Sequence, residues 1–77
     1  MSGLEGRRVL ITGAARGIGA ATAKRLHERG ARLALAGIEP EQLALTAAEC
    51  GDAPAIHCDV RNRAEVEHAV QTAVDHL

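Results

Sequence analysis

Apolar and polar positions divide the chain into three apolar blocks, each followed by a longer stretch with helical spacing. The unbroken run Val9-Leu10-Ile11 predicts a strand over Arg7–Thr12, because a parallel strand that is covered on both faces lacks polar alternation. Shorter apolar blocks predict a second strand over Arg32–Ala36, which ends at Gly37, and a third strand over Ala55–Cys58.

Two helices are predicted between these strands. The first covers Gly17–Arg29, and Gly30 follows it in the position where a glycine commonly ends a helix. The second runs from Pro40, which suits the first turn of a helix, to about Cys50. On the first helix, the residues expected to face the core are Ile18, Ala21, Thr22 and Leu26.

A third helix is predicted after the last strand. Asn62 is suited to cap it, and Glu65 follows three residues later, as in a capping box with Asn in place of the usual Ser or Thr. The expected apolar stripe of this helix consists of Val66, Val70, Ala73, Val74 and Leu77.

The alternation of strands and helices predicts an α/β fold. The order β-α-β-α-β-α, with glycines after the first strand, is typical of part of a Rossmann-type parallel sheet. Right-handed crossovers place the strands in the order 3-2-1. We therefore expect residues 1–77 to form the N-terminal part of one domain, without a second domain.

The junction between the first strand and the first helix is rich in glycine. Its sequence, Thr12-Gly13-Ala14-Ala15-Arg16-Gly17-Ile18-Gly19, has the spacing G-x-x-x-G-x-G, which differs from the commoner G-x-G-x-x-G. Gly13 allows a tight exit from the strand, Gly17 allows close approach of a pyrophosphate, and Gly19 allows close helix–strand packing. The alternative is a mobile glycine loop without a function.

Composition narrows the range of partners and environments. The net charge of −1 argues against nucleic acid or an anionic membrane surface as the main partner. The chain has no signal-peptide pattern and no apolar run of the roughly 18 residues that a membrane span requires. Its two cysteines, Cys50 and Cys58, lack metal-ligand spacing and are expected to be reduced. These features predict a cytoplasmic protein.

The glycine-rich junction resembles the T-G-x-x-x-G-I-G motif of the short-chain dehydrogenase/reductase family. Asp59-Val60 resembles the D-V element that this family carries after its third strand. The resemblance extends from about Leu4 to Leu77. It implies NAD(P)-dependent oxidation or reduction of an alcohol or carbonyl substrate by an enzyme that is a homo-oligomer.

The catalytic residues of that family have no counterparts in this chain. The family uses an Asn, a Ser and a Tyr-x-x-x-Lys pair, whereas this sequence has no tyrosine, Lys24 as its only lysine and Ser2 as its only serine. We therefore expect the N-terminal, cofactor-binding portion of a longer enzyme, inactive alone. The alternative is a non-catalytic nucleotide-binding or interaction module that is complete at residue 77.

The resemblance also implies which residues bind the cofactor. They are Gly13, Ala15, Arg16, Gly17, Ile18, Gly19, Gly37, Ile38, Asp59 and Val60.

Two of these residues favour NADP over NAD. Gly37 stands where NAD-dependent members carry an Asp for the ribose 2′-hydroxyl, so that no carboxylate repels a 2′-phosphate there. Arg16 resembles the basic residue that NADP-preferring members place in the glycine loop. Ile38 argues against NADP, because many such members have an Arg there. Glu39 is either a ligand of the ribose or an acid favoured near the start of a helix.

Asp59 has two interpretations. By resemblance, its carboxylate accepts a hydrogen bond from the adenine amino group while Val60 and Ile38 enclose the ring. Alternatively, Asp59 only caps the turn after the third strand. Nearby, Arg61 and Arg63 are expected to be solvated residues that flank the strand and the helix.

Overall fold

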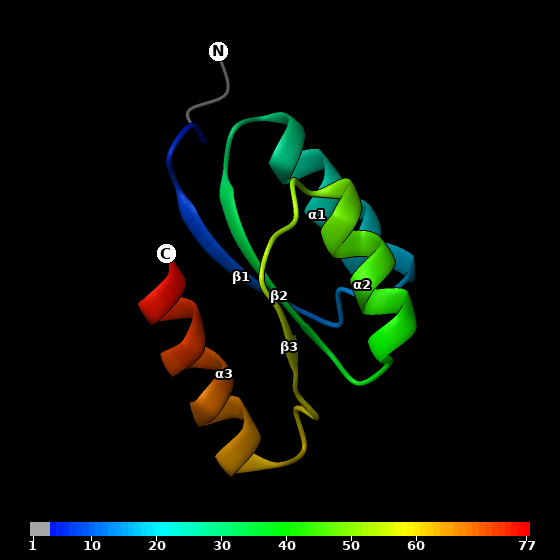
Figure 1. Cartoon of the computed structure of the whole chain (residues 1–77), viewed down its shortest axis with the longest axis vertical. Helices are drawn as coiled ribbons and strands as arrows, with labels where there is room; N and C mark the ends of the chain where they lie inside the picture. Colours follow the sequence, from blue (N-terminus) through cyan, green and yellow to red (C-terminus); the bar gives the residue numbers. More distant parts are fainter. Residues whose placement is uncertain (1–3) are drawn as a thin grey trace.

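The computed structural model describes residues 4–77, which form a parallel sheet with helices on both faces (Figure 1). Ser2 lies outside this range. The elements are β1 (Arg8–Thr12), α1 (Gly17–Glu28), β2 (Arg32–Gly37), α2 (Pro40–Glu49), β3 (Ala55–His57) and α3 (Arg63–His76). The predicted alternation of strands and helices is confirmed. No predicted boundary differs from the observed one by more than one residue.

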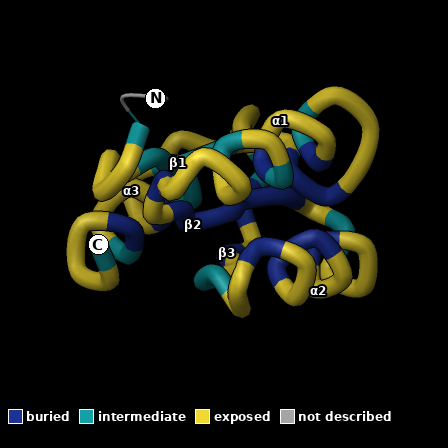
Figure 2. Tube along the Cα trace, turned by 90° about the horizontal axis from the view of Figure 1, so that it is seen from above, coloured by how far each residue is buried: buried dark blue, intermediate teal, exposed yellow. Residues whose placement is uncertain are grey.

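The sheet contains three parallel strands in the order β1-β2-β3, which reads 3-2-1 from the opposite edge. Val9 of β1 lies opposite Leu33 of β2, and Ala36 of β2 lies opposite Ile56 of β3. Because β2 pairs on both sides, it is the most buried strand, as Figure 2 shows. Within residues 4–77, the other edge of β1 has no partner strand.

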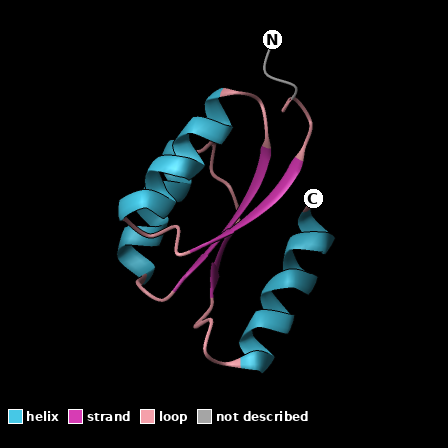
Figure 3. Cartoon of the chain, turned by 180° about the vertical axis from the view of Figure 1, so that it is seen from behind, coloured by secondary structure: helices cyan, strands magenta, loops and turns pink. Residues whose placement is uncertain are grey.

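Helices α1 and α2 cover one face of this sheet, and α3 lies on the other face (Figure 3). Under α1 and α2, the core contains Leu33, Leu35 and Leu43 among smaller residues, with Val9 and Ile11 packed at its margin. Leu35 is fully buried. This is the larger of the two apolar clusters.

The core beneath α3 consists of smaller side chains. Ala34 and Ala36 of β2 contact Ala69 and Ala73 of α3, together with Ile56 of β3. Alanines on both sides let the helix backbone approach the sheet closely. The buried side of α3 is therefore an alanine stripe.

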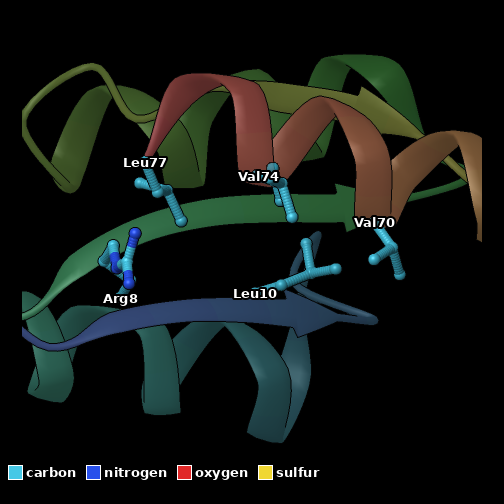
Figure 4. Close-up of a pocket in the computed structure, with 6 residues that line it drawn as sticks. Arg8, Leu10, Val70, Val74 and Leu77 are labelled. Atoms are coloured by element: carbon cyan, nitrogen blue, oxygen red, sulfur yellow. The ribbon is translucent and has the colours of Figure 1, made fainter.

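A groove remains beside this contact, between the free edge of β1 and α3 (Figure 4). Leu10 points into it from β1, and Val70 and Val74 border it from α3. Val70 and Val74 are exposed, so the predicted apolar stripe of α3 is wrong at these two positions. Ala73 of the predicted stripe is buried, as expected, and the core beneath α3 also contains Ala69, which lies one position before Val70 and outside the predicted stripe.

The predicted core-facing side of α1 is also wrong in part. Ile18 is 86% exposed, Ala21 and Thr22 are exposed as well, and the buried residues of α1 are Ala20 and Ala23. The side of α1 that packs on the sheet therefore consists mainly of small residues, and the absence of a Cβ at Gly19 allows the helix to lie close to the backbone of Gly13. Leu26 is partly buried against the core, as expected.

Candidate functional site

A cleft of about 450 Å³ lies at the carboxyl ends of the three strands. It is lined by Thr12 and Gly13 at the end of β1, by Gly37 and Ile38 at the end of β2, and by residues 58–61 after β3. In open α/β sheets, ligands bind outside the carboxyl ends of the strands. The cleft therefore has the position expected of a binding site in this architecture.

The glycine loop forms one wall of this cleft, and its backbone requires glycine at particular positions. Gly13 and Gly17 both have a φ of +65°, a conformation that other residues rarely adopt. Gly19 contacts the loop so closely that a Cβ there would overlap the carbonyl oxygen of Gly13. The roles predicted for Gly13 and Gly19 in a tight exit and in close packing agree with this geometry.

Hydrogen bonds hold the loop against the sheet and α2. The backbone N–H of Ala14 donates to the carbonyl of Ala36 at 3.1 Å. The buried hydroxyl of Thr46 donates to the carbonyl of Ala15 at 3.3 Å, so that α2 also supports the loop. A loop with these contacts is an ordered part of the fold. This geometry argues against the alternative of a mobile glycine loop.

The N-terminus of α1 begins directly after this loop. Its N-cap residue, Arg16, has an extended backbone and makes no side-chain hydrogen bond to the first turn. The first backbone N–H groups of a helix have no partner within the helix, and the helix dipole makes this end electropositive. This end of α1 can therefore bind an anion.

Gly37 differs from the loop glycines, because its conformation does not require glycine. A Cβ at residue 37 would lie 3.5 Å from the side chains of Ala15 and Leu43, which is an ordinary contact. The fold would thus accept a small side chain at the end of β2, and glycine at this position leaves that volume empty. Gly37 also lines the cleft.

Arg16 and Glu39 form an ion pair beside the loop. Arg16 Nε lies 2.9 Å from Glu39 Oε1, and the two side chains are 75% and 39% exposed. Glu39 is the N-cap residue of α2, but its side chain makes no cap hydrogen bond. The sequence suggested a role for each residue separately and did not reveal this pair.

Asp59 and Arg61, which both line the cleft, form a second ion pair. Asp59 Oδ1 accepts hydrogen bonds from the backbone N–H of Arg61 at 2.9 Å and from its Nε at 3.1 Å. Asp59 Oδ2 accepts a third from Arg61 Nη2 at 2.9 Å. The expectation that Arg61 is merely a solvated flanking residue is therefore wrong, although the guanidinium remains exposed.

These hydrogen bonds explain the ionisation of Asp59. They stabilise the carboxylate, and they lower the pKa of Asp59 from 3.8 to about 2. The bond from the Arg61 N–H, two residues along, also closes the turn after β3. The turn-capping interpretation of Asp59 is thus confirmed, and a free lone pair on the carboxylate leaves the ligand-binding interpretation open.

The backbone of the same turn is fixed by α3. Glu65 Oε1 accepts a hydrogen bond from the N–H of Asp59 at 3.0 Å and lies 3.2 Å from His57 Nδ1. The side chain of Asn62 accepts a hydrogen bond from the N–H of Glu65, so the predicted helix cap is confirmed. Glu65 contacts the turn instead of the backbone of its own cap.

Eight of the ten predicted site residues line one of two pockets, and Ile18 and Gly19 line neither of them. Gly13, Gly37, Ile38, Asp59 and Val60 line the cleft. Ala15, Arg16 and Gly17 line an adjoining groove between α1 and α2. Ile38 and Val60 are 53% and 62% exposed at the edge of the cleft, where apolar side chains can contact a flat ring.

Other kinds of site find little support in the part of the chain that the structure describes. Residues 4–77 contain no group of three or more His, Cys, Asp or Glu side chains placed to hold a metal ion. None of their helices has both the length and the apolar character that crossing a bilayer demands. Cys50 and Cys58 are buried free thiols whose pKa values are raised by burial, which disfavours the reactive thiolate.

Comparison with known proteins identifies relatives over nearly the whole chain. Residues 7–77 match the family model described as short chain dehydrogenase. Tropinone reductase-like 2 from Erythroxylum coca is 46% identical over 72 residues, which cover 92% of this chain and 26% of that protein.

Two solved structures share the fold. A short chain dehydrogenase/reductase from Burkholderia phymatum in complex with NAD has a TM-score of 0.90 and 29% identity, covering 97% of this chain and 28% of that one. The 3-ketoacyl-(acyl-carrier-protein) reductase from Brucella melitensis, complexed with NADH, has a TM-score of 0.90 and 36% identity, covering 95% of this chain and 30% of that one. The chain thus spans between a quarter and a third of the length of these relatives.

Proposed function

Because the chain belongs to the short-chain dehydrogenase family, we propose that it forms the dinucleotide-binding part of an NAD(P)-dependent oxidoreductase. In the whole protein, hydride would pass between the nicotinamide and an alcohol or carbonyl substrate. The two similar structures hold NAD and NADH, which supports a nicotinamide dinucleotide as the cofactor.

The observation that carries this proposal is the joint position of the glycine loop and the cleft. The loop ends at the electropositive N-terminus of α1, and the cleft continues from Gly13 past the ends of β2 and β3. This arrangement offers an anion site next to a cleft with the apolar residues Ile38 and Val60 at its edge. A pyrophosphate fits the first and an adenosine fits the second.

The choice between NADP and NAD rests on the residues of this chain. We propose that NADP is favoured, because Gly37 leaves space without a carboxylate and Arg16 lies beside the loop. Arg16 would have to exchange Glu39 for the 2′-phosphate. An exposed ion pair contributes only about 0–1 kcal/mol, whereas a guanidinium can form two parallel hydrogen bonds to a phosphate.

The reaction itself needs groups that the described residues do not supply in the cleft. A bound nicotinamide dinucleotide provides the hydride chemistry, and a protein must add a proton donor or acceptor near the substrate. The ionisable residues that line the cleft are Asp59 and Arg61, which are bonded to each other, and Cys58, whose buried thiol has a raised pKa. The role we propose for this chain is therefore to bind and orient the cofactor.

Calorimetric titration of the full chain with NADP and with NAD tests the proposal. We expect tighter binding of NADP, and we expect Arg16→Ala to reduce its affinity by about tenfold, the effect of one lost hydrogen bond between charged groups. The affinity for NAD should change little in this variant.

Arg25→Ala serves as the matched control, because Arg25 is an exposed residue in the last turn of α1, away from the loop. It should leave both affinities unchanged. Absence of binding to either dinucleotide would contradict the proposed function. Equal affinities in the wild-type chain would contradict only the preference for NADP.

A further inference from the structure

The Asp59–Arg61 pair contains an arrangement that turn formation alone does not require. The backbone N–H of Arg61 already closes the turn by donating to Asp59 Oδ1. The guanidinium adds a bond to the same oxygen at 3.1 Å and another to Oδ2 at 2.9 Å. These two bonds fix the plane of the carboxylate and not merely the position of one oxygen.

We propose that Arg61 is a positioning residue, which orients the Asp59 carboxylate so that Oδ2 recognises the exocyclic amino group of an adenine. This inference rests on the proposed function and on the adenine contact that the family resemblance implies for Asp59, and it adds to them the role of Arg61. A carboxylate has about four lone-pair sites, and Arg61 occupies two on Oδ1 and one on Oδ2. One acceptor site on Oδ2 is left for a ligand.

The backbone of Asp59 is as firmly held as its side chain. Its N–H donates to Glu65 Oε1 at 3.0 Å, and its carbonyl accepts from the N–H of Asn62 at 2.9 Å. Asp59 therefore enters a complex with its conformation already set, and little rotational freedom is lost on binding. In the absence of the guanidinium, the carboxylate plane would be held only by the Arg61 N–H.

The chemistry of the acceptor determines which base is recognised. An ionised carboxylate only accepts hydrogen bonds, and the lowered pKa of Asp59 keeps it ionised far below neutral pH. Adenine presents an amino donor at its six position, whereas hypoxanthine presents a carbonyl oxygen there. If the carbonyl oxygen of hypoxanthine faced Oδ2, both oxygens would be acceptors and no hydrogen bond could form between them, which would weaken binding.

The opposite role for Arg61 is also physically possible. If its guanidinium blocked the carboxylate, a ligand would have to displace it, and removing it would strengthen binding. The Asp59 side chain is 27% exposed and the Arg61 side chain is 84% exposed. The guanidinium therefore extends outward into solvent while part of the carboxylate stays accessible, which favours positioning over blocking.

The test compares the affinities of the full chain for NAD and for nicotinamide hypoxanthine dinucleotide by calorimetry. We expect the wild-type chain to prefer NAD by about tenfold or more, as for one hydrogen bond to a charged group. In Arg61→Ala, this preference should fall to about threefold or less, mainly through weaker binding of NAD. Arg61→Lys, which lacks the planar fork, should also lower the preference.

Two further variants separate positioning from a general effect on folding or charge. Arg63→Ala removes a nearby exposed arginine that pairs with Glu67, and it should leave the preference unchanged. In the Asp59→Ala background, adding Arg61→Ala should not lower the preference further, because Arg61 acts through Asp59. A merely electrostatic role of Arg61 would lower the affinity for both dinucleotides equally.

The outcomes distinguish this inference from the proposed function. If the wild-type chain binds neither dinucleotide, the proposed function fails and the inference fails with it. If it binds both equally, the inference alone is overturned. The inference is also overturned if Arg61→Ala retains the wild-type preference or binds NAD more tightly.

Discussion

The two faces of the sheet differ although they are built from the same strands. In β2, leucine and alanine alternate, so that Leu33 and Leu35 point toward α1 and α2 while Ala34 and Ala36 point toward α3. We call these the leucine face and the alanine face. Two helices close the leucine face, whereas one helix covers part of the alanine face and leaves the groove beside Leu10.

The difference shows that side-chain size sets the kind of contact each face makes. Large residues fill the space between the sheet and two helices, and they remove much apolar surface from water. Small residues allow a close approach but bury less area per contact. We therefore expect the leucine face to contribute most of the stability and the alanine face to open more easily.

The largest expected effect is that of Leu35→Ala on the leucine face. Leu35 is fully buried, so its truncation removes apolar contacts and leaves a cavity. We expect the free energy of unfolding to fall by about 3 kcal/mol, measured by urea denaturation.

Leu10→Ala is the matched variant on the alanine face. Leu10 is partly buried and borders the open groove, so the same truncation should destabilise the chain by only about 1 kcal/mol. Equal losses in the two variants would show that the groove is closed in solution, and the distinction between the faces would be abandoned.

The fold could be predicted largely because its signals are local. The unbroken Val9-Leu10-Ile11 run, the glycines after it and the Asn62 cap each depend on neighbours in the sequence. The faces of α1 and α3 could not be predicted in the same way. The sides that pack include Ala23 and Ala69, which the predictions omitted, because hydrophobic periodicity gives more weight to large residues such as Ile18 and Val70.

In the site, too, features with local sequence signals could be predicted, whereas contacts between side chains could not. The motif identified the residues that line the cleft, because the carboxyl ends of parallel strands meet at one edge. The pairs Arg16–Glu39 and Asp59–Arg61 were missed, since a side-chain partner depends on rotamers and on how loops approach each other. For Asp59, the spacing of two residues was a usable signal, because aspartate commonly bonds the backbone two positions on.

An intermediate loss of stability is expected when an aspartate is introduced on the buried side of α3, compared with a second variant that carries it on the exposed side. Ala73 is buried against the sheet, and Ala73→Asp should destabilise the chain by about 2 kcal/mol, since its carboxylate would have to leave water. Val74→Asp, at the next position, should cost about 0.5 kcal/mol, because Val74 is 64% exposed. Thermal unfolding followed by circular dichroism measures both.

The two residues are neighbours near the C-terminal end of α3, so the interaction of an added acid with the helix dipole is similar in both variants. Helix propensity adds up to about 0.7 kcal/mol to the loss in Ala73→Asp, because alanine is a better helix former than valine or aspartate. A large loss in Val74→Asp would indicate that the outer side of α3 is covered in solution. That result would contradict the description of the alanine face as open.

The smallest expected effect is a loss of local stability in α3 as the pH falls. The turn that leads into α3 is held by charged contacts of Asp59, whereas the helices on the leucine face pack through apolar side chains. The pKa of Asp59 is about 2 in the folded chain and 3.8 in the reference state, so its ionised form stabilises the fold. This contribution is complete above about pH 4 and is lost as the pH falls toward 2.

Amide hydrogen exchange at several acidic pH values measures this effect, after correction for intrinsic exchange rates. Between pH 4 and pH 2, protection should decrease more in α3 than in α1. Asp59→Asn should flatten the decrease in α3, since an asparagine side chain at this position does not ionise. An unchanged decrease in that variant would assign the acid sensitivity to groups other than the Asp59–Arg61 pair, and the alanine face would then owe its weaker closure to packing alone.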